Sequence, residues 1–191
     1  MRALATCLTT LLLCAVAAPA LAANPPRPPF REGKADFAPD ELSITYAFGP
    51  GAVDFAPTDN LSLGVAVDQV FGAQDWLYRA TYKLVSNDMS GVDIALNVAA
   101  MQTREELAGG TYLAPVWGYQ GGVLATFATD SGLIFRAGLQ LYDTDWGTPG
   151  GQKALITPEI AYRYGLLEIT LQPNLPFSLG DWTWVGLRLR I

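Results

Sequence analysis

The chain ends with the stretch WVGLRLRI, residues 184–191, in which two kinds of residue alternate up to the last position. Val185, Leu187, Leu189 and Ile191 fall on one side, and a glycine and two arginines fall on the other. Successive side chains of a strand point to opposite faces, so this alternation predicts a half-buried strand. Chain ends commonly fray. A strand pattern that reaches the carboxylate therefore indicates that backbone pairing holds the last residues.

The same alternation recurs through most of the chain and predicts an all-β fold, an antiparallel up-and-down barrel of eight strands. Short and long connections alternate along the chain, as they do between the two rims of a transmembrane barrel. No segment after the N-terminus has a convincing helical period. The expected strands are residues 60–70, 75–85, 91–101, 119–129, 132–142, 154–164, 166–173 and 182–191.

Ten strands are the alternative, since single-chain bacterial barrels have even strand numbers. This count requires residues 41–48 to form a strand and residues 111–129 to fold into two strands at Gly121 and Gly122. Pro158 lies inside a predicted strand, where it lacks a backbone donor, so we expect a bulge or a loss of pairing there.

The N-terminus predicts export. Residues 1–22 combine a positive start, an apolar run and a small-x-small site, which is typical of a cleaved signal peptide. Both cysteines, Cys7 and Cys14, lie in it. Residues 23–40 are rich in proline and charge and predict a flexible, solvated leader. Residues 41–191 are the expected barrel domain.

Alternation alone does not say which face points inward. We expect the apolar face to point to lipid and the polar face to line the lumen, because the charges of the polar face are nearly balanced and could pair in a closed interior. The expected lumen charge network is Asp68, Arg79, Lys83, Asp93, Arg136, Glu159, Arg163, Glu168, Arg188 and Arg190. Aromatic residues near the strand ends predict a girdle at the headgroups, formed by Trp76, Tyr78, Tyr142, Trp146, Tyr162, Tyr164 and Trp182.

At its C-terminus the chain resembles the small outer-membrane β-barrel proteins of Gram-negative bacteria. Their last strand carries an assembly signal with a glycine, a hydrophobic residue and a terminal aromatic residue. Gly186, Leu189 and Ile191 occupy these positions here, with Ile191 in place of the aromatic residue and Trp184 where a polar residue is usual. The resemblance implies location in the outer membrane, with the lipid bilayer and the barrel-assembly machinery as partners.

Enzymatic chemistry has little support in the sequence. The chain has no histidine, which excludes Ser–His catalysis and metal sites that need histidine. Asp143 and Asp145 could offer oxygen ligands to calcium, but the spacing of a known calcium loop is missing. We expect no catalytic residues, no metal and no cofactor. The net charge of −6 disfavours a nucleic-acid partner.

The expected function is therefore a small outer-membrane barrel with a non-enzymatic role, either structural, adhesive or in the passage of a small apolar molecule. Two alternatives stay open. One is a soluble exported barrel in the periplasm, similar to a lipocalin, that binds a hydrophobic ligand inside. The other is an outer-membrane enzyme that uses carboxylates.

Overall fold

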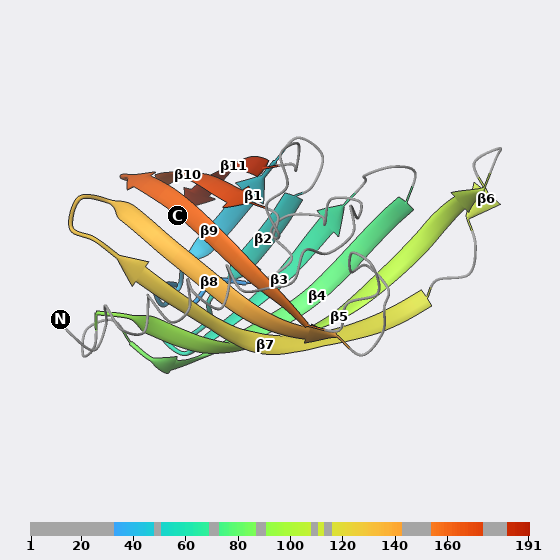
Figure 1. Ribbon diagram of the computed structural model, residues 1–191, viewed down its shortest axis with the longest axis horizontal. Coiled ribbons are helices and arrows are strands. Elements are labelled where there is room, and N and C mark those ends of the chain that lie inside the picture. Colours follow the sequence, from blue (N-terminus) through green and yellow to red (C-terminus); the bar gives the residue numbers. More distant parts are fainter. Residues whose placement is uncertain are drawn as a thin grey trace.

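The computed structural model describes residues 33–47, 51–68, 73–86, 91–107, 111–112, 116–142, 154–173 and 183–191. These residues form antiparallel strands that run obliquely around a common axis (Figure 1). The strands are β1 (Leu42–Tyr46), β2 (Gly51–Phe55), β3 (Leu61–Asp68), β4 (Ala73–Val85), β5 (Asp93–Leu107), β6 (Thr111–Tyr112), β7 (Val116–Ala128), β8 (Leu133–Tyr142), β9 (Ala154–Tyr164), β10 (Leu167–Pro173) and β11 (Thr183–Arg190).

Ten of these strands form a closed antiparallel barrel, and the two-residue β6 pairs with the end of β5 (Figure 1). Sequence neighbours pair around the ring, and β1 pairs with β11 to close it. The predicted all-β antiparallel barrel is confirmed, but the count of eight strands is wrong and the alternative of ten is correct. Within the described residues, no helix is long and apolar enough to span a membrane.

The two extra strands are β1 and β2, and only β1 coincides with a segment that the sequence singled out. β2 is five residues long and lies next to proline and glycine residues, so its alternation is too short to stand out. It pairs with β1 on one side and with β3 on the other. Tertiary pairing, rather than a strong local pattern, defines this strand.

Gly121 and Gly122 do not form the turn that the ten-strand alternative required, because β7 runs through both without a break. Gly122 pairs with Asn97 of β5 and with Gln140 of β8. A Cβ at Gly122 would lie 2.2 Å from the carbonyl oxygen of Leu139 and 2.6 Å from the Gln140 side chain. The glycine is therefore needed for close approach of neighbouring strands and not for a reversal of the chain.

Pro158 interrupts the ladder on one side of β9. It stays in register with Ala137 of β8, whereas the pairing of β9 with β10 ends at Ile160 and Leu171. Loss of pairing is one of the two outcomes that the missing backbone donor predicts.

The two faces of the barrel wall differ sharply. Large hydrophobic side chains such as Leu63, Leu96 and Leu139 are 44–51% exposed on the outside. Arg136, three positions before Leu139 on the same strand but on the other face, is only 8% exposed. Among strand residues whose side chains are described, every charged one lies at an inward position.

The opening stretch of sequence closes this ring. Ile191 exchanges two backbone hydrogen bonds of 2.8 Å with Leu42, the first residue of β1. Residues 43–46 of β1 pair one by one with Arg190, Leu189, Arg188 and Leu187 of β11. The pattern continues to the end of the chain because residues 187–191 form the seam between the last strand and the first.

Candidate functional site

The interior contains an ion-paired cluster built by β8, β9, β10 and β11. Strand register places Arg136 opposite Glu159, and Glu168 opposite both Arg163 and Arg188. All five side chains point inward because they occupy alternate positions on neighbouring strands. The backbone pairing of the four strands therefore determines which of these side chains lie side by side.

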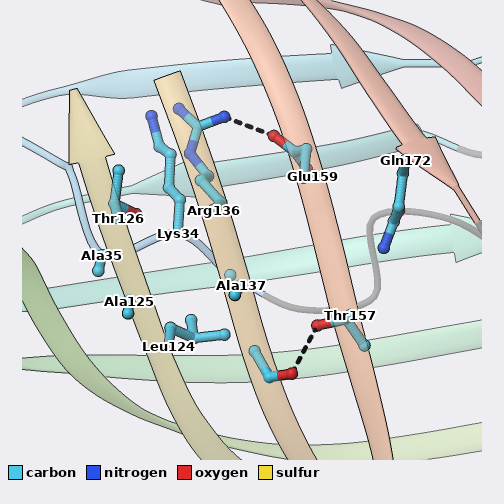
Figure 2. Close-up of a pocket in the computed structure, with 12 residues that line it drawn as sticks. Lys34, Ala35, Leu124, Ala125, Thr126, Arg136, Ala137, Thr157, Glu159 and Gln172 are labelled. Atoms are coloured by element: carbon cyan, nitrogen blue, oxygen red, sulfur yellow. Dashed lines mark hydrogen bonds and ion pairs between the residues drawn. The ribbon is translucent and has the colours of Figure 1, made fainter. Parts of the chain in front are cut away.

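Glu168 lies at the centre of this cluster and is 0% exposed. Its carboxylate accepts hydrogen bonds from Arg136 at 2.8 and 3.0 Å, from Arg188 at 2.6 Å and from Arg163 at 3.2 and 3.3 Å. Glu159 binds the same Arg136 guanidinium, as the dashed line in Figure 2 shows. Buried charges are tolerated only when they are paired and hydrogen-bonded, and this pair of carboxylates meets that condition.

Residues 33–37 lie inside the barrel and complete the cluster, which corrects the expectation of a solvated leader for these residues, whereas residues 38–40 are exposed. Lys34, Ala35 and Phe37 are 4%, 0% and 3% exposed. Lys34 pairs with Glu41, and Figure 2 shows Lys34 beside Arg136 in the interior. We call residues 33–41 the internal segment.

Asp36 of the internal segment is bound by arginines of three strands. Arg136 donates to both of its carboxylate oxygens at 2.9 Å, Arg163 donates at 2.6 Å and Arg190 at 2.8 Å. Burial raises the pKa of Asp36, but the charge and hydrogen bonds of Arg136, followed by the charge of Arg190, outweigh it and hold the pKa well below its ordinary value. Asp36 is therefore a carboxylate at neutral pH.

Lys34 experiences the opposite balance. Burial, followed by the positive charges of Arg190 and Arg188, lowers the pKa of its amine from 10.5 to about 8, although Asp36 and Glu41 act to raise it. The interior thus disfavours a further positive charge. The arginines of the wall exceed the carboxylates of the wall, and the internal segment supplies the compensating anions.

Two further ion pairs lie on the other side of the interior. Arg79 of β4 donates to Asp54 of β2 at 2.7 and 2.6 Å, in a two-point contact across Gly64 of the intervening strand. Lys83 lies 4.0 Å from Asp93, and it donates to the backbone oxygen of Phe37 at 2.5 Å. The ammonium group of Lys83 also lies 4.4 Å from the centre of the Phe37 ring.

The structure therefore divides the expected lumen network into parts. One cluster contains six of the expected residues, namely Arg136, Glu159, Arg163, Glu168, Arg188 and Arg190. Separate contacts involve Arg79, Lys83 and Asp93. The side chain of Asp68 is outside the described residues. Sequence reasoning missed the partners Lys34, Asp36, Glu41 and Asp54. Only Asp54 carried a usable signal, since it alternates with Val53 and Phe55.

Several inward polar atoms of the described residues make no hydrogen bond to protein. They include both side-chain polar atoms of Gln120 and of Gln140, and hydroxyl groups of Thr126 and Thr170. A cavity of about 20 Å³ adjoins Lys34 and Arg136, which is room for one water molecule. The barrel interior thus contains uncharged polar side chains as well as charged ones.

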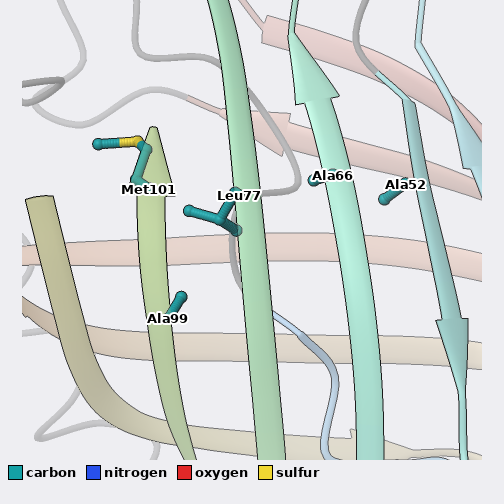
Figure 3. Packing of buried hydrophobic residues seen from close by; sticks show 5 residues of the cluster. All are labelled: Ala52, Ala66, Leu77, Ala99 and Met101. Carbon is teal, nitrogen blue, oxygen red and sulfur yellow. The ribbon is translucent and has the colours of Figure 1, made fainter. Parts of the chain in front are cut away.

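One inward patch is apolar. It consists of Ala52, Ala66, Leu77, Ala99 and Met101, which project from four adjacent strands, β2 to β5 (Figure 3). Strand register places Ala66 opposite Leu77, and Leu77 opposite Met101. The inner surface of β2 to β5 is therefore apolar at this place.

The expected girdle is only partly within the described side chains. Tyr78, Tyr162 and Tyr164 are outward and 43%, 50% and 81% exposed, and the Tyr78 ring stacks on Trp117 at 6.3 Å. Trp76 is half-buried. The side chains of Tyr142, Trp146 and Trp182 are outside the described residues. Trp117 and Tyr119 are outward aromatic residues that the sequence reasoning did not include.

The residues of the expected assembly signal lie on β11 and at its end. Leu189 and Ile191 face outward and are 39% and 61% exposed. Gly186 is buried on the inner face, and the side chain of Trp184 is outside the described residues. Asp143 and Asp145 also lie outside them.

Comparison of the chain with protein-family models, with curated proteins and with solved structures finds no match in any of the three.

Proposed function

We propose that this protein is an integral outer-membrane β-barrel with a non-enzymatic, structural or adhesive role. The observation that carries the proposal is the distribution of charge across the wall. Among the strand residues with described side chains, charged ones face inward, and the outer face is formed by leucine, isoleucine, valine, alanine, glycine, proline and aromatic residues, with Gln102 near the end of β5 as the exception. Lipid-facing positions of transmembrane barrels have this composition.

The extent of the apolar surface supports insertion into lipid. Twenty-seven large hydrophobic side chains of the described residues are exposed, and they occur on all ten strands of the ring or at their ends. Soluble monomers rarely expose contiguous apolar patches beyond a few hundred Å². A closed barrel also leaves no strand edge without a partner, which a bilayer requires because lipid offers no hydrogen bonds.

The interior argues against the soluble alternative. A soluble barrel that binds a hydrophobic ligand needs an apolar interior, yet here the buried charges Arg79, Arg136, Glu159, Glu168 and Arg188 all point inward. The carboxylates of the described interior contact arginine or lysine side chains. Carboxylates held in this way are poor candidates for proton transfer at neutral pH, so we favour a non-enzymatic role.

The first test is a charge placed on the outer face. Val98 is outward, 59% exposed and near the middle of β5. Val98→Arg should lower the free energy of unfolding in lipid vesicles by about 2–4 kcal/mol, the cost of arginine near the bilayer centre. Asp59→Arg is the control, because Asp59 is exposed in the turn between β2 and β3. A soluble barrel would tolerate both variants equally, and that result would reject the proposal.

Fractionation gives an independent measurement. An inserted barrel is recovered with outer membranes and migrates differently on gels before and after heating. Recovery in the soluble periplasmic fraction, without a heat-dependent shift in migration, contradicts the proposal. Depletion of the barrel-assembly machinery tests whether insertion of the barrel depends on it. Ile191→Asp tests the same dependence from the side of the chain, at the terminal position of the expected assembly signal.

Binding of a small apolar molecule is a second candidate, favoured by the inward patch on β2 to β5. Leu77→Asn should abolish the fluorescence increase of an apolar dye, whereas Leu63→Asn on the outer face of the adjacent strand should not abolish it. Equal dye binding by both variants would remove this candidate.

A further inference from the structure

The carboxylate of Asp36 occupies a binding site rather than a simple ion pair. Arg136 holds it with a two-point fork, in which Nε donates to one oxygen and Nη2 to the other, both at 2.9 Å. Arg163 and Arg190 donate to the second oxygen at 2.6 and 2.8 Å. Fork-shaped contacts of this kind are how arginine recognises a planar carboxylate. The three arginines belong to β8, β9 and β11, so the site is part of the barrel wall.

The wall carries an excess of positive charge at this place. Four arginines, Arg136, Arg163, Arg188 and Arg190, face two wall carboxylates, Glu159 and Glu168. Two positive charges therefore need an anion that the wall does not supply. Asp36 and Glu41 of the internal segment supply two negative charges and Lys34 supplies one positive charge, so the segment compensates one of the two positive charges in net terms. An uncompensated buried charge is costly, so this site requires an anion.

The internal segment is attached to the interior mainly through donors of the wall. Arg190 donates to the Asp36 backbone oxygen at 2.6 Å, and Lys83 donates to that of Phe37 at 2.5 Å. No strand includes residues 33–41, but the end of the segment is held by backbone hydrogen bonds, from Asp40 N–H to the Ala56 oxygen at 2.8 Å and from Ala56 N–H to the Glu41 oxygen at 2.9 Å. Breaking the contacts from Arg190 and Lys83 would leave every backbone pairing of the wall intact.

The site is open to water on one side. The side chain of Arg163 is 30% exposed, against 7% for that of Arg136. Arg163 lies two residues before the tight turn at Gly165, at the rim where the short connections are found. A small solute can reach the arginines from this rim.

We propose that Arg136, Arg163 and Arg190 form a carboxylate-binding site of the barrel interior, which Asp36 of the same chain occupies and which a small carboxylate solute takes when residues 33–37 withdraw. Asp36 acts as a tethered ligand, whose effective concentration is on the order of millimolar or higher. A free carboxylate therefore competes weakly in the native protein and strongly once the Asp36 carboxylate is removed.

The test uses the full chain in detergent with formate as the probe. Asp36→Ala removes a group of the size of formate, and Asp40→Ala is the control, since Asp40 is exposed in the same segment. Formate at about ten times its dissociation constant should raise the melting temperature of Asp36→Ala by about 3–6 °C. It should leave the control and the wild type unchanged, and chloride at equal ionic strength should have no such effect. An equal response of both variants, or an equal effect of chloride, overturns the proposal.

A second variant covers failure of Asp36→Ala to fold. Asp36→Asn keeps the size of the side chain and removes its charge. Formate in detergent should raise the melting temperature of Asp36→Asn, whose three arginines have lost their anionic ligand, and should leave Asp40→Asn unchanged. An equal response of the two variants overturns the proposal. Failure of the wild type to insert would count against the proposed function, whereas the formate result in detergent would be unaffected.

Discussion

Replacement of Glu168 by glutamine tests how the charged interior contributes to stability. Glu168 is 0% exposed, and its two oxygens accept hydrogen bonds from Arg136, Arg163 and Arg188, with Arg190 at 3.7 Å. Glutamine has nearly the same volume, so Glu168→Gln removes a charge without creating a cavity. The amide group would also place N–H donors against guanidinium donors.

The expected loss follows from the burial of these partners. Removal of one member of a buried ion pair typically costs about 3–5 kcal/mol, because the remaining charge stays buried without compensation. Arg136 and Arg188 keep Glu159 as a partner, which places the expected loss near the lower limit, about 3 kcal/mol. At about 1.4 kcal/mol per factor of ten, the ratio of folded to unfolded protein should fall by about two orders of magnitude.

Urea unfolding in detergent or lipid, followed by tryptophan fluorescence, measures this loss. Asp130→Asn is the matched control, because Asp130 is an exposed carboxylate in the turn between β7 and β8; it should change the free energy of unfolding by less than about 0.5 kcal/mol. The double variant Glu168→Gln, Arg188→Gln removes one charge of each sign and should lose less than the sum of the two single variants. Equal stability of Glu168→Gln and the control, or strict additivity in the double variant, would refute the reasoning.

Three further predictions concern close packing and protonation. Gly122→Ala should destabilise the barrel by about 1–3 kcal/mol, since its Cβ meets the Leu139 carbonyl, whereas Gly121→Ala has room and should be near neutral in the same unfolding assay; equal effects would contradict this. The lowered pKa of Lys34, about 8 against 10.5, means that the native state binds fewer protons than the unfolded chain between these values. Stability should therefore rise with pH across that window, by about 3 kcal/mol, and Lys34→Met should lack this rise in unfolding measured at pH 8 and pH 10. The lowered pKa of Asp36 predicts stability that is present above the unfolded value of 3.8 and lost as the pH falls from there through the folded value. Acid titration of Asp36→Asn should lack this loss, and an identical acid profile for the variant and the wild type would argue against it.

Local pattern was sufficient for most of the wall. The alternation in GLIFRAGLQLY and in the terminal stretch predicted β8 and β11 within one residue or two at each end. This succeeds because a two-residue period appears in the sequence whenever one face of a strand is apolar and the other polar. Where the pattern was short, as in β2, local reasoning missed the strand. In β7 the single strand expected over residues 119–129 is confirmed, and only the division at Gly121 and Gly122 that the ten-strand alternative required is wrong.

The sequence by itself determined an all-β, antiparallel, closed barrel and the sets of residues that share a face. Only the tertiary structure decided the strand count, the inward direction of the charges and the partners of each charge. The physical reason is that alternation is a local property, whereas closure and charge pairing depend on residues far apart in the chain. Asp36 binds arginines that are 100 to 154 positions away, and its own neighbourhood is an irregular, proline-rich segment without any period. No local pattern could have placed that carboxylate among the arginines of the barrel interior.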